Sequence, residues 1–220
     1  MKRAIQIMFV FLVVGMFLVA PVAAQSNQGL SWGVSVSDRI DFNFVVDTDT
    51  DSINEPMYAS ITSTPVIPDS ISGWGAVPTA VSDWKWAAND TSIGLYGLIF
   101  LTLIAVGSHM SVPVGNFTLM TTLVSAALTG EVMIDDVFYW GVQYTVDTSS
   151  TEHTTVAARY FKSDGFLAKL TVEEFENDVR TGYIAISRQG FMTTIADNFL
   201  IIIAGAVVLV VLVIVCVKRK

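Results

Sequence analysis

Alternation of apolar and polar positions predicts several β-strands. Residues Ile40 to Val46 place apolar side chains at every second position, which is typical of a strand with one buried face. After a polar turn region at 48–56, Met57 to Ser63 is the expected partner of this strand. Stretches rich in β-branched and aromatic residues predict further strands at 137–146, 154–161, 166–172 and 179–186. Ser163-Asp164-Gly165 favours a hairpin turn, so these strands should form an antiparallel meander.

A helical period replaces this alternation between Phe117 and Leu128. One face of the predicted helix carries Leu119, Met120, Leu123, Val124 and Ala127. Asn116 precedes the helix and is its expected N-cap. The sequence therefore predicts an α+β domain over 25–194, mainly antiparallel β-sheet with one packing helix.

A shorter apolar run extends from Ile93 to Val106. Its fourteen residues would span about 21 Å as a helix, which is short for a bilayer crossing. A crossing here would also place the C-terminal cations outside, against the positive-inside rule. We expect a buried strand or a core helix, and periodicity does not decide between them.

The N-terminus has the three parts of a secretory signal peptide. A basic start, Met1-Lys2-Arg3, is followed by an apolar stretch from Ala4 to Ala20. Val22 and Ala24 supply the small side chains that a signal peptidase needs, so we expect residues 1–24 to be removed. The alternative is an uncleaved signal anchor.

The C-terminus carries a longer apolar run, from Phe199 to Val217, with no charge and no proline. As a helix it would span about 28 Å, close to the ~30 Å of a hydrocarbon core. Lys218-Arg219-Lys220 follow at once, and such cations stay on the cytoplasmic side. We predict a transmembrane helix at 195–217 and a cytoplasmic basic tail at 218–220. The chain would then be a single-pass type I protein of the cell membrane, with its bulk extracytoplasmic.

Composition fits this architecture. Hydrophobic residues make up 52% of the chain and charged residues 15%. The single cysteine, Cys216, lies inside the predicted span, so the exported part must fold without a disulfide. That part holds seven cations and all twenty acids, a net charge near −13. Such a surface repels phosphate and argues against nucleic acid as a partner.

Two groups of residues suggest ligand binding, and each has a simpler interpretation. Asp47, Asp49 and Asp51 resemble the start of a calcium loop, but Ser52 and Tyr58 stand where that loop needs glycine and glutamate. A solvated hairpin loop is favoured, so no metal site is predicted. The tryptophans could stack on sugars, although tryptophan is more often buried core; they are Trp32, Trp74, Trp84, Trp86 and Trp140.

The sequence predicts no catalytic residue and no cofactor. His109 and His153 lack metal-binding spacing, and no nucleophile elbow, phosphate loop or HExxH pattern is present. The adjacent carboxylates Asp135-Asp136 and Glu173-Glu174 are better explained as solvated strand edges. Asn89-Asp90-Thr91 and Asn116-Phe117-Thr118 both fit the N-glycosylation sequon, so Asn89 and Asn116 are glycosylation candidates.

Three segments carry a family resemblance: Ser31-Trp32-Gly33-Val34-Ser35-Val36, Val112-Pro113-Val114-Gly115-Asn116-Phe117-Thr118 and Tyr160-Phe161-Lys162-Ser163-Asp164-Gly165-Phe166-Leu167. With this layout the chain resembles archaeal surface proteins of the choice-of-anchor type, particularly those of Asgard-group archaea. The resemblance implies a signal peptide, one exported domain and a C-terminal anchor helix, and it implies no activity. One departure is Ser37-Asp38, where a glycine-aspartate pair is expected.

These features predict a non-enzymatic surface domain that contributes to the envelope or to adhesion, with envelope proteins or glycans as partners. The competing hypothesis is binding of a lipid or isoprenoid in a half-barrel cavity, closed by the helix Phe117–Leu128 and lined by Ile93–Val106. A third alternative is a hydrolase whose carboxylates are brought together only by the fold.

Overall fold

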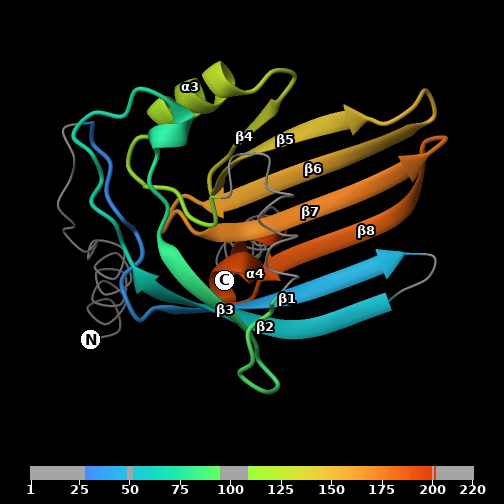
Figure 1. The fold of residues 1–220 in the computed structure, drawn as a ribbon, viewed down its shortest axis with the longest axis horizontal. Coiled ribbons are helices and arrows are strands. Elements are labelled where there is room, and N and C mark those ends of the chain that lie inside the picture. Colours follow the sequence, from blue (N-terminus) through green and yellow to red (C-terminus); the bar gives the residue numbers. More distant parts are fainter. Residues whose placement is uncertain (1–27, 49–51, 95–108, 200, 202–220) are drawn as a thin grey trace, which may run out of the picture.

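The computed structural model describes residues 28–48, 52–94, 109–199 and 201. Within them, eight strands form one antiparallel sheet (Figure 1). The strands are β1 (Arg39–Thr48), β2 (Ser52–Ser63), β3 (Val81–Trp86), β4 (Val132–Asp135), β5 (Tyr139–Asp147), β6 (Glu152–Phe161), β7 (Leu167–Glu176) and β8 (Val179–Arg188). The helical elements are η1 (Trp74–Ala76), α3 (Phe117–Ala127) and α4 (Phe191–Asp197).

The sheet joins two meanders through its first and last strands. The order across it is β3-β2-β1-β8-β7-β6-β5-β4, so β1 and β8 pair in the middle. Turns Thr148–Thr151 and Asn177–Asp178 lie together at one end of the strands, which we call the hairpin end. At the other end, called the closed end, loops and α3 cover the sheet (Figure 1). The predicted antiparallel sheet with a packing helix is confirmed.

One face of the sheet carries the main core, as the alternation in β1 predicts. Ile40, Phe42 and Phe44 are buried, whereas the intervening Asp41 and Asn43 are not. The ring of Phe42 packs 4.9 Å from that of Trp84, and the ring of Phe44 lies 5.9 Å from that of Trp86. Both tryptophans belong to the edge strand β3, and their side chains cover the phenylalanine side chains of β1 on this face of the sheet.

The three segments that carry the family resemblance meet at the closed end. Ser31 and Val114 exchange two backbone hydrogen bonds of 2.9 and 2.8 Å, and the Val112 amide donates to the Gly165 carbonyl at 2.8 Å. Gly165 has φ of +70°, and a Cβ there would lie 2.0 Å from the Val112 carbonyl oxygen. Glycine is therefore required where these segments touch. The segments hold the closed end together.

Helix α3 covers part of this end. Asn116 caps it as predicted, with its Oδ1 accepting from the Leu119 amide at 3.0 Å. Met120, Leu123 and Val124 are buried, as the predicted face requires. Thr121 accepts a 2.9 Å hydrogen bond from the indole of Trp140 on β5, which ties the helix to the sheet.

Helix α4 packs on the opposite face of the sheet. Tyr139 precedes Trp140, so its side chain points away from the main core, and it pairs across strands with Phe161. Tyr139, Phe161 and Ala168 form a second buried cluster, against which Ala196 of α4 packs. The predicted domain boundary at residue 194 thus falls inside α4, and the ordered contacts continue beyond it.

Some expectations differ from the structure, and others lie outside the described residues. Ser52 to Pro56 belong to β2 rather than to a polar turn, because they pair in register with β1. The described part of the chain contains no helix long and apolar enough to cross a membrane. Four expectations fall wholly or mostly outside the described residues: the predicted signal peptide at 1–24, the predicted span at 195–217, the predicted tail at 218–220 and the apolar run at 93–106.

Candidate functional site

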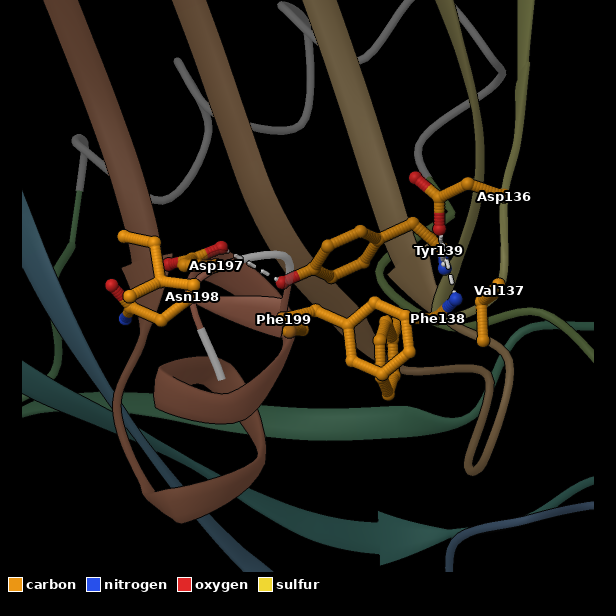
Figure 2. A pocket seen from close by; sticks show the side chains of 9 residues that line it. Asp136, Val137, Phe138, Tyr139, Asp197, Asn198 and Phe199 are labelled. Carbon is orange, nitrogen blue, oxygen red and sulfur yellow. Dashed lines mark hydrogen bonds between the residues drawn. The ribbon is translucent and has the colours of Figure 1, made fainter. Parts of the chain in front are cut away.

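An apolar surface lies where α4 meets the turn between β4 and β5. We call it the apolar corner and define it by Val137, Phe138, Phe199 and Ile201. These residues line an open pocket of about 500 Å³ (Figure 2). The Phe138 and Phe199 rings stand edge to face with their centroids 4.9 Å apart. Val137 and Ile201 are 71% and 72% exposed, so two large apolar side chains face solvent at one spot.

Hydrogen bonds hold the corner in this shape. Asp136 Oδ1 accepts from the amides of Phe138 and Tyr139 at 2.8 and 2.7 Å, which fixes the turn. The Phe138 carbonyl accepts from the Lys162 amide at 2.8 Å, so the turn is also tied to the β6–β7 hairpin. Lys162 forms an ion pair with Asp135 as well.

Tyr139 links the corner to α4. Its hydroxyl donates to Asp197 Oδ1 at 3.0 Å (Figure 2). Burial raises the pKa of Tyr139 above its ordinary value of 10.0, and the hydrogen bond to Asp197 raises it further. The phenol therefore stays neutral as a donor and holds α4 on the sheet.

A second, polar pocket of about 300 Å³ lies at the hairpin end. Glu152 and Glu176 face each other across β6 and β7, and Glu174 lies on the same face two residues away. His153 points to the other face, where its ring stacks on Phe175 at 4.7 Å. Among the described residues, no three acidic, histidine or cysteine side chains are grouped to hold a metal ion.

The two histidines occupy unrelated environments. His109 is buried at the closed end, with its Nε2 within 2.8 Å of the Val77 carbonyl and its ring against Trp74. His153 lies on β6 near the hairpin end. The fold does not bring them together, so they do not form a joint site.

The candidate carboxylates are also separated by the fold. Asp47 ends β1 opposite Ser52, whereas Asp49 and Asp51 lie outside the described residues. Glu173 and Glu174 are successive strand residues and point to opposite faces, and Glu173 lies 3.4 Å from Arg180. Asp135 pairs with Lys162, and Asp136 accepts from two backbone amides, so each of these carboxylates has a structural contact of its own. Neither adjacent pair is arranged as an acid–base pair.

The tryptophan side chains pack in or against the core and do not form an exposed surface on which a sugar could stack. Trp74 and Trp140 are buried. Trp84 and Trp86 share a face of β3, as expected for a strand, and that face packs on the core. Trp32 is half-buried and donates from its indole to the Pro65 carbonyl at 2.6 Å.

The two sequon asparagines differ in the hydrogen bonding of the side-chain nitrogen, the atom that would carry a glycan. The amide nitrogen of Asn116 donates to the Gln28 carbonyl at 2.8 Å, so this side chain is engaged at both ends. Asn89 is exposed in a turn, and its carbonyl oxygen accepts from the amide and hydroxyl of Thr91 at 3.1 and 2.7 Å. These bonds use only the oxygen of the Asn89 side chain and not the nitrogen that would carry a glycan, so Asn89 is the better glycosylation candidate.

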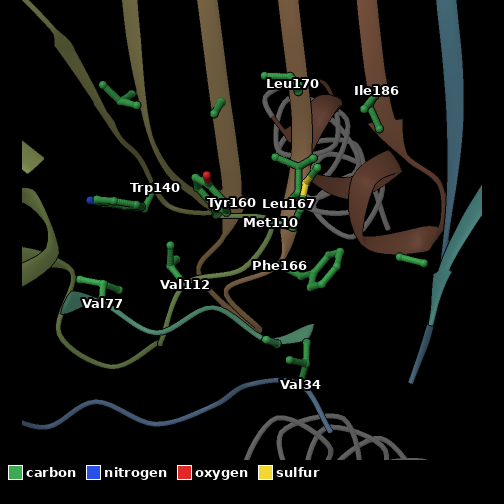
Figure 3. Packing of buried hydrophobic residues seen from close by; sticks show 14 of the residues in the cluster. Val34, Val77, Met110, Val112, Trp140, Tyr160, Phe166, Leu167, Leu170 and Ile186 are labelled. Atoms are coloured by element: carbon green, nitrogen blue, oxygen red, sulfur yellow. The ribbon is translucent and has the colours of Figure 1, made fainter. Parts of the chain in front are cut away.

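Large side chains fill the closed end beneath α3. Figure 3 shows Trp140, Tyr160 and Leu167 among the buried residues there, and all three are fully buried. The Tyr160 hydroxyl donates to the His109 carbonyl at 2.7 Å. Trp140 is hydrogen-bonded to Thr121 of α3, and its ring lies 5.8 Å from that of Tyr160, so an apolar ligand placed between α3 and the sheet would have to displace these two side chains.

Sequence reasoning missed the apolar corner. The only local signals were Val137-Phe138 beside Asp136, which acts as an Asx turn, and the aromatic Phe199 at the start of the apolar run. Comparison with family models, curated proteins and solved structures found no significant match to this chain.

Proposed function

We propose that this chain is a membrane-anchored extracytoplasmic interaction module without enzymatic activity. One observation carries the proposal: α4 is fixed on the sheet through Ala196 and Asp197, immediately before the apolar run from Phe199 to Val217. A helix over that run is long enough to span a bilayer. The folded domain is therefore coupled to its anchor through α4, with only Asn198 between α4 and the apolar run. The resemblance to choice-of-anchor surface proteins implies the same architecture.

The surface offered to a partner follows from this attachment. Helix α4 covers one face of the sheet, and the proposed anchor would leave the domain there. The β5–β6 and β7–β8 turns project from the far end of the strands (Figure 1). These turns and the strand ends beside them carry polar and acidic residues, including Glu152, Glu176 and Asp178. Envelope proteins or glycans would meet this hairpin end first. The acidic, solvated surface of the hairpin end also repels anionic headgroups, which favours an orientation with this end away from the membrane.

Epitope accessibility on intact cells tests this orientation. A short tag inserted between Ser149 and Ser150 would sit in an exposed turn away from the core. An antibody should stain intact cells that express the tagged full chain. Cross-linking through the same turn should capture envelope proteins or glycans.

A second tag placed after Lys220 is the matched control, and it should stain only after permeabilisation. Staining of the Ser149–Ser150 tag only after permeabilisation would contradict the proposal. Turnover of common hydrolase substrates by the purified chain would contradict the absence of enzymatic activity.

A further inference from the structure

We propose that the apolar corner, Val137, Phe138, Phe199 and Ile201, lies in the boundary between headgroups and acyl chains and forms a second contact with the bilayer. This inference rests on the proposed membrane anchoring. It adds a specific surface of the folded domain to the contact that the anchor itself makes. The partner is a lipid surface, not a discrete ligand.

Exposure and clustering first mark the corner as an interaction surface. Scattered exposed valines are ordinary, and the sheet has others, such as Val179 at 65% exposure. Val137 and Ile201 differ because they line one pocket together with two aromatic rings. Exposed apolar side chains that gather in this way suit contact with a partner or a membrane better than scattered ones do.

The course of the chain identifies the occupant. Ile201 belongs to both the corner and the apolar run, and the sequence continues without a charged residue to Val217. Wherever that run enters the hydrocarbon core, Phe199 and Ile201 stand at its edge. Val137 and Phe138 line the same pocket as these residues, so they reach the same depth. Phenylalanine, tryptophan and leucine are the side chains that interfacial apolar surfaces bury at the boundary between headgroups and acyl chains.

The charged groups around the corner are compatible with this depth. Asp135 is paired with Lys162, Asp136 accepts two backbone amides, and Asp197 accepts from Tyr139. Carboxylates with such partners lose less on approaching a medium of low dielectric than unpaired ones would. They mark the polar rim of the corner, which stays at headgroup level.

A second contact would set the orientation of the domain. A single helix leaves a domain free to tilt about its junction, whereas a second contact from a separate part of the chain restricts that tilt. The corner draws on the β4–β5 turn and on the segment after α4, and the Tyr139–Asp197 bond joins these parts. With the corner in the boundary region, the hairpin end points away from the lipid.

The test uses the full chain in phosphatidylcholine vesicles. In a Cys216→Ala background, Val137→Cys and, as the matched control, Val179→Cys each receive an environment-sensitive fluorophore. Both positions are exposed valines, so labelling leaves the core intact. A small fraction of lipid spin-labelled near the headgroup serves as quencher. We expect quenching several-fold stronger at residue 137 than at 179, with blue-shifted emission only at 137.

Each other outcome overturns the inference in a recognisable way. Equal, weak quenching at both positions in protein that floats with the vesicles would show that the anchor holds and the corner does not touch lipid. Blue-shifted emission at 137 without quenching would show that protein covers the corner instead. Protein that fails to float would remove the proposed anchoring, and this inference with it.

Discussion

Removing the Tyr139 hydroxyl tests whether α4 is held to the sheet by a defined contact. In Tyr139→Phe the ring still packs on Phe161, but the 3.0 Å bond to Asp197 is lost. Hydrogen bonds to charged groups contribute about 1.5–3 kcal/mol when buried. Because Asp197 is exposed and regains water, we expect a smaller loss of about 1 kcal/mol. With about 1.4 kcal/mol per factor of ten, opening of α4 should become roughly fivefold more frequent.

Hydrogen exchange measures this directly on the full chain in a detergent micelle or nanodisc. The amides of Thr194 and Asn198, which donate to the Gly190 and Thr194 carbonyls, report on α4. They should exchange faster in Tyr139→Phe, whereas amides in β1 should not change. Tyr183→Phe is the control, since that ring stands over Arg180 on β8. Unchanged exchange at Thr194 and Asn198, or an equal change in the control, would refute the reasoning.

Three further predictions concern stability. Phe42→Ala should lower the free energy of unfolding by about 3–5 kcal/mol in a denaturant titration, because Phe42 is fully buried against Trp84 and Phe166; a loss near zero would contradict the assigned core. Asn116→Ala should cost about 2 kcal/mol by removing the cap and the bond to Gln28, whereas Thr118→Ala, which removes only the sequon, should leave the unfolding midpoint unchanged. Burial raises the pKa of Tyr160, so its neutral form stabilises the fold fully below pH 10.0, and this contribution is lost as the pH rises towards the folded-state value. Stability should therefore fall at alkaline pH, less steeply in Tyr160→Phe, and an equal slope would count against the burial.

Local patterns were sufficient for most strands and for α3. The alternation over Ile40–Val46 predicted β1 because this strand has one buried face, and side-chain period alone encodes that. The helix after Asn116 was predicted because cap and apolar face agree. In both cases the local preference and the tertiary environment point in the same direction.

The strand ends were less predictable where polar residues continue a strand. β7 was expected to stop at Val172, but it extends to Glu176, and Asn177-Asp178 then form a two-residue turn with φ of 52° and 62°. These values belong to the turn type that joins tight hairpins. The glutamates at the end of β7 interrupt the apolar pattern, so the pattern alone does not predict that the strand continues. β2 was cut short for the same reason, since all residues from Ser52 to Pro56 except the half-buried Ile53 are exposed.

The apolar corner could not be predicted because it depends on long-range contacts. Nothing in the local sequence places Phe199 beside Phe138, since the two meet only after β5 pairs with β6 and α4 folds back onto Tyr139 and Phe161. The pairing of β1 with β8 is equally non-local. The apolar run from Phe199 to Val217 predicted an anchor, but the packing of α4 against the sheet could be found only in the structure.

Flotation of the full chain with phosphatidylcholine vesicles tests the central claim of anchoring most directly. Wild-type protein should rise with the lipid in a density gradient. Leu209→Arg combined with Val213→Arg places two charges within the apolar run, at about 2.5–3.5 kcal/mol each near the middle of a span, and should leave the protein at the bottom. Val179→Arg, at the exposed hairpin end, should float as wild type does. Flotation of the doubly charged variant, or sedimentation of the wild type, would contradict the account.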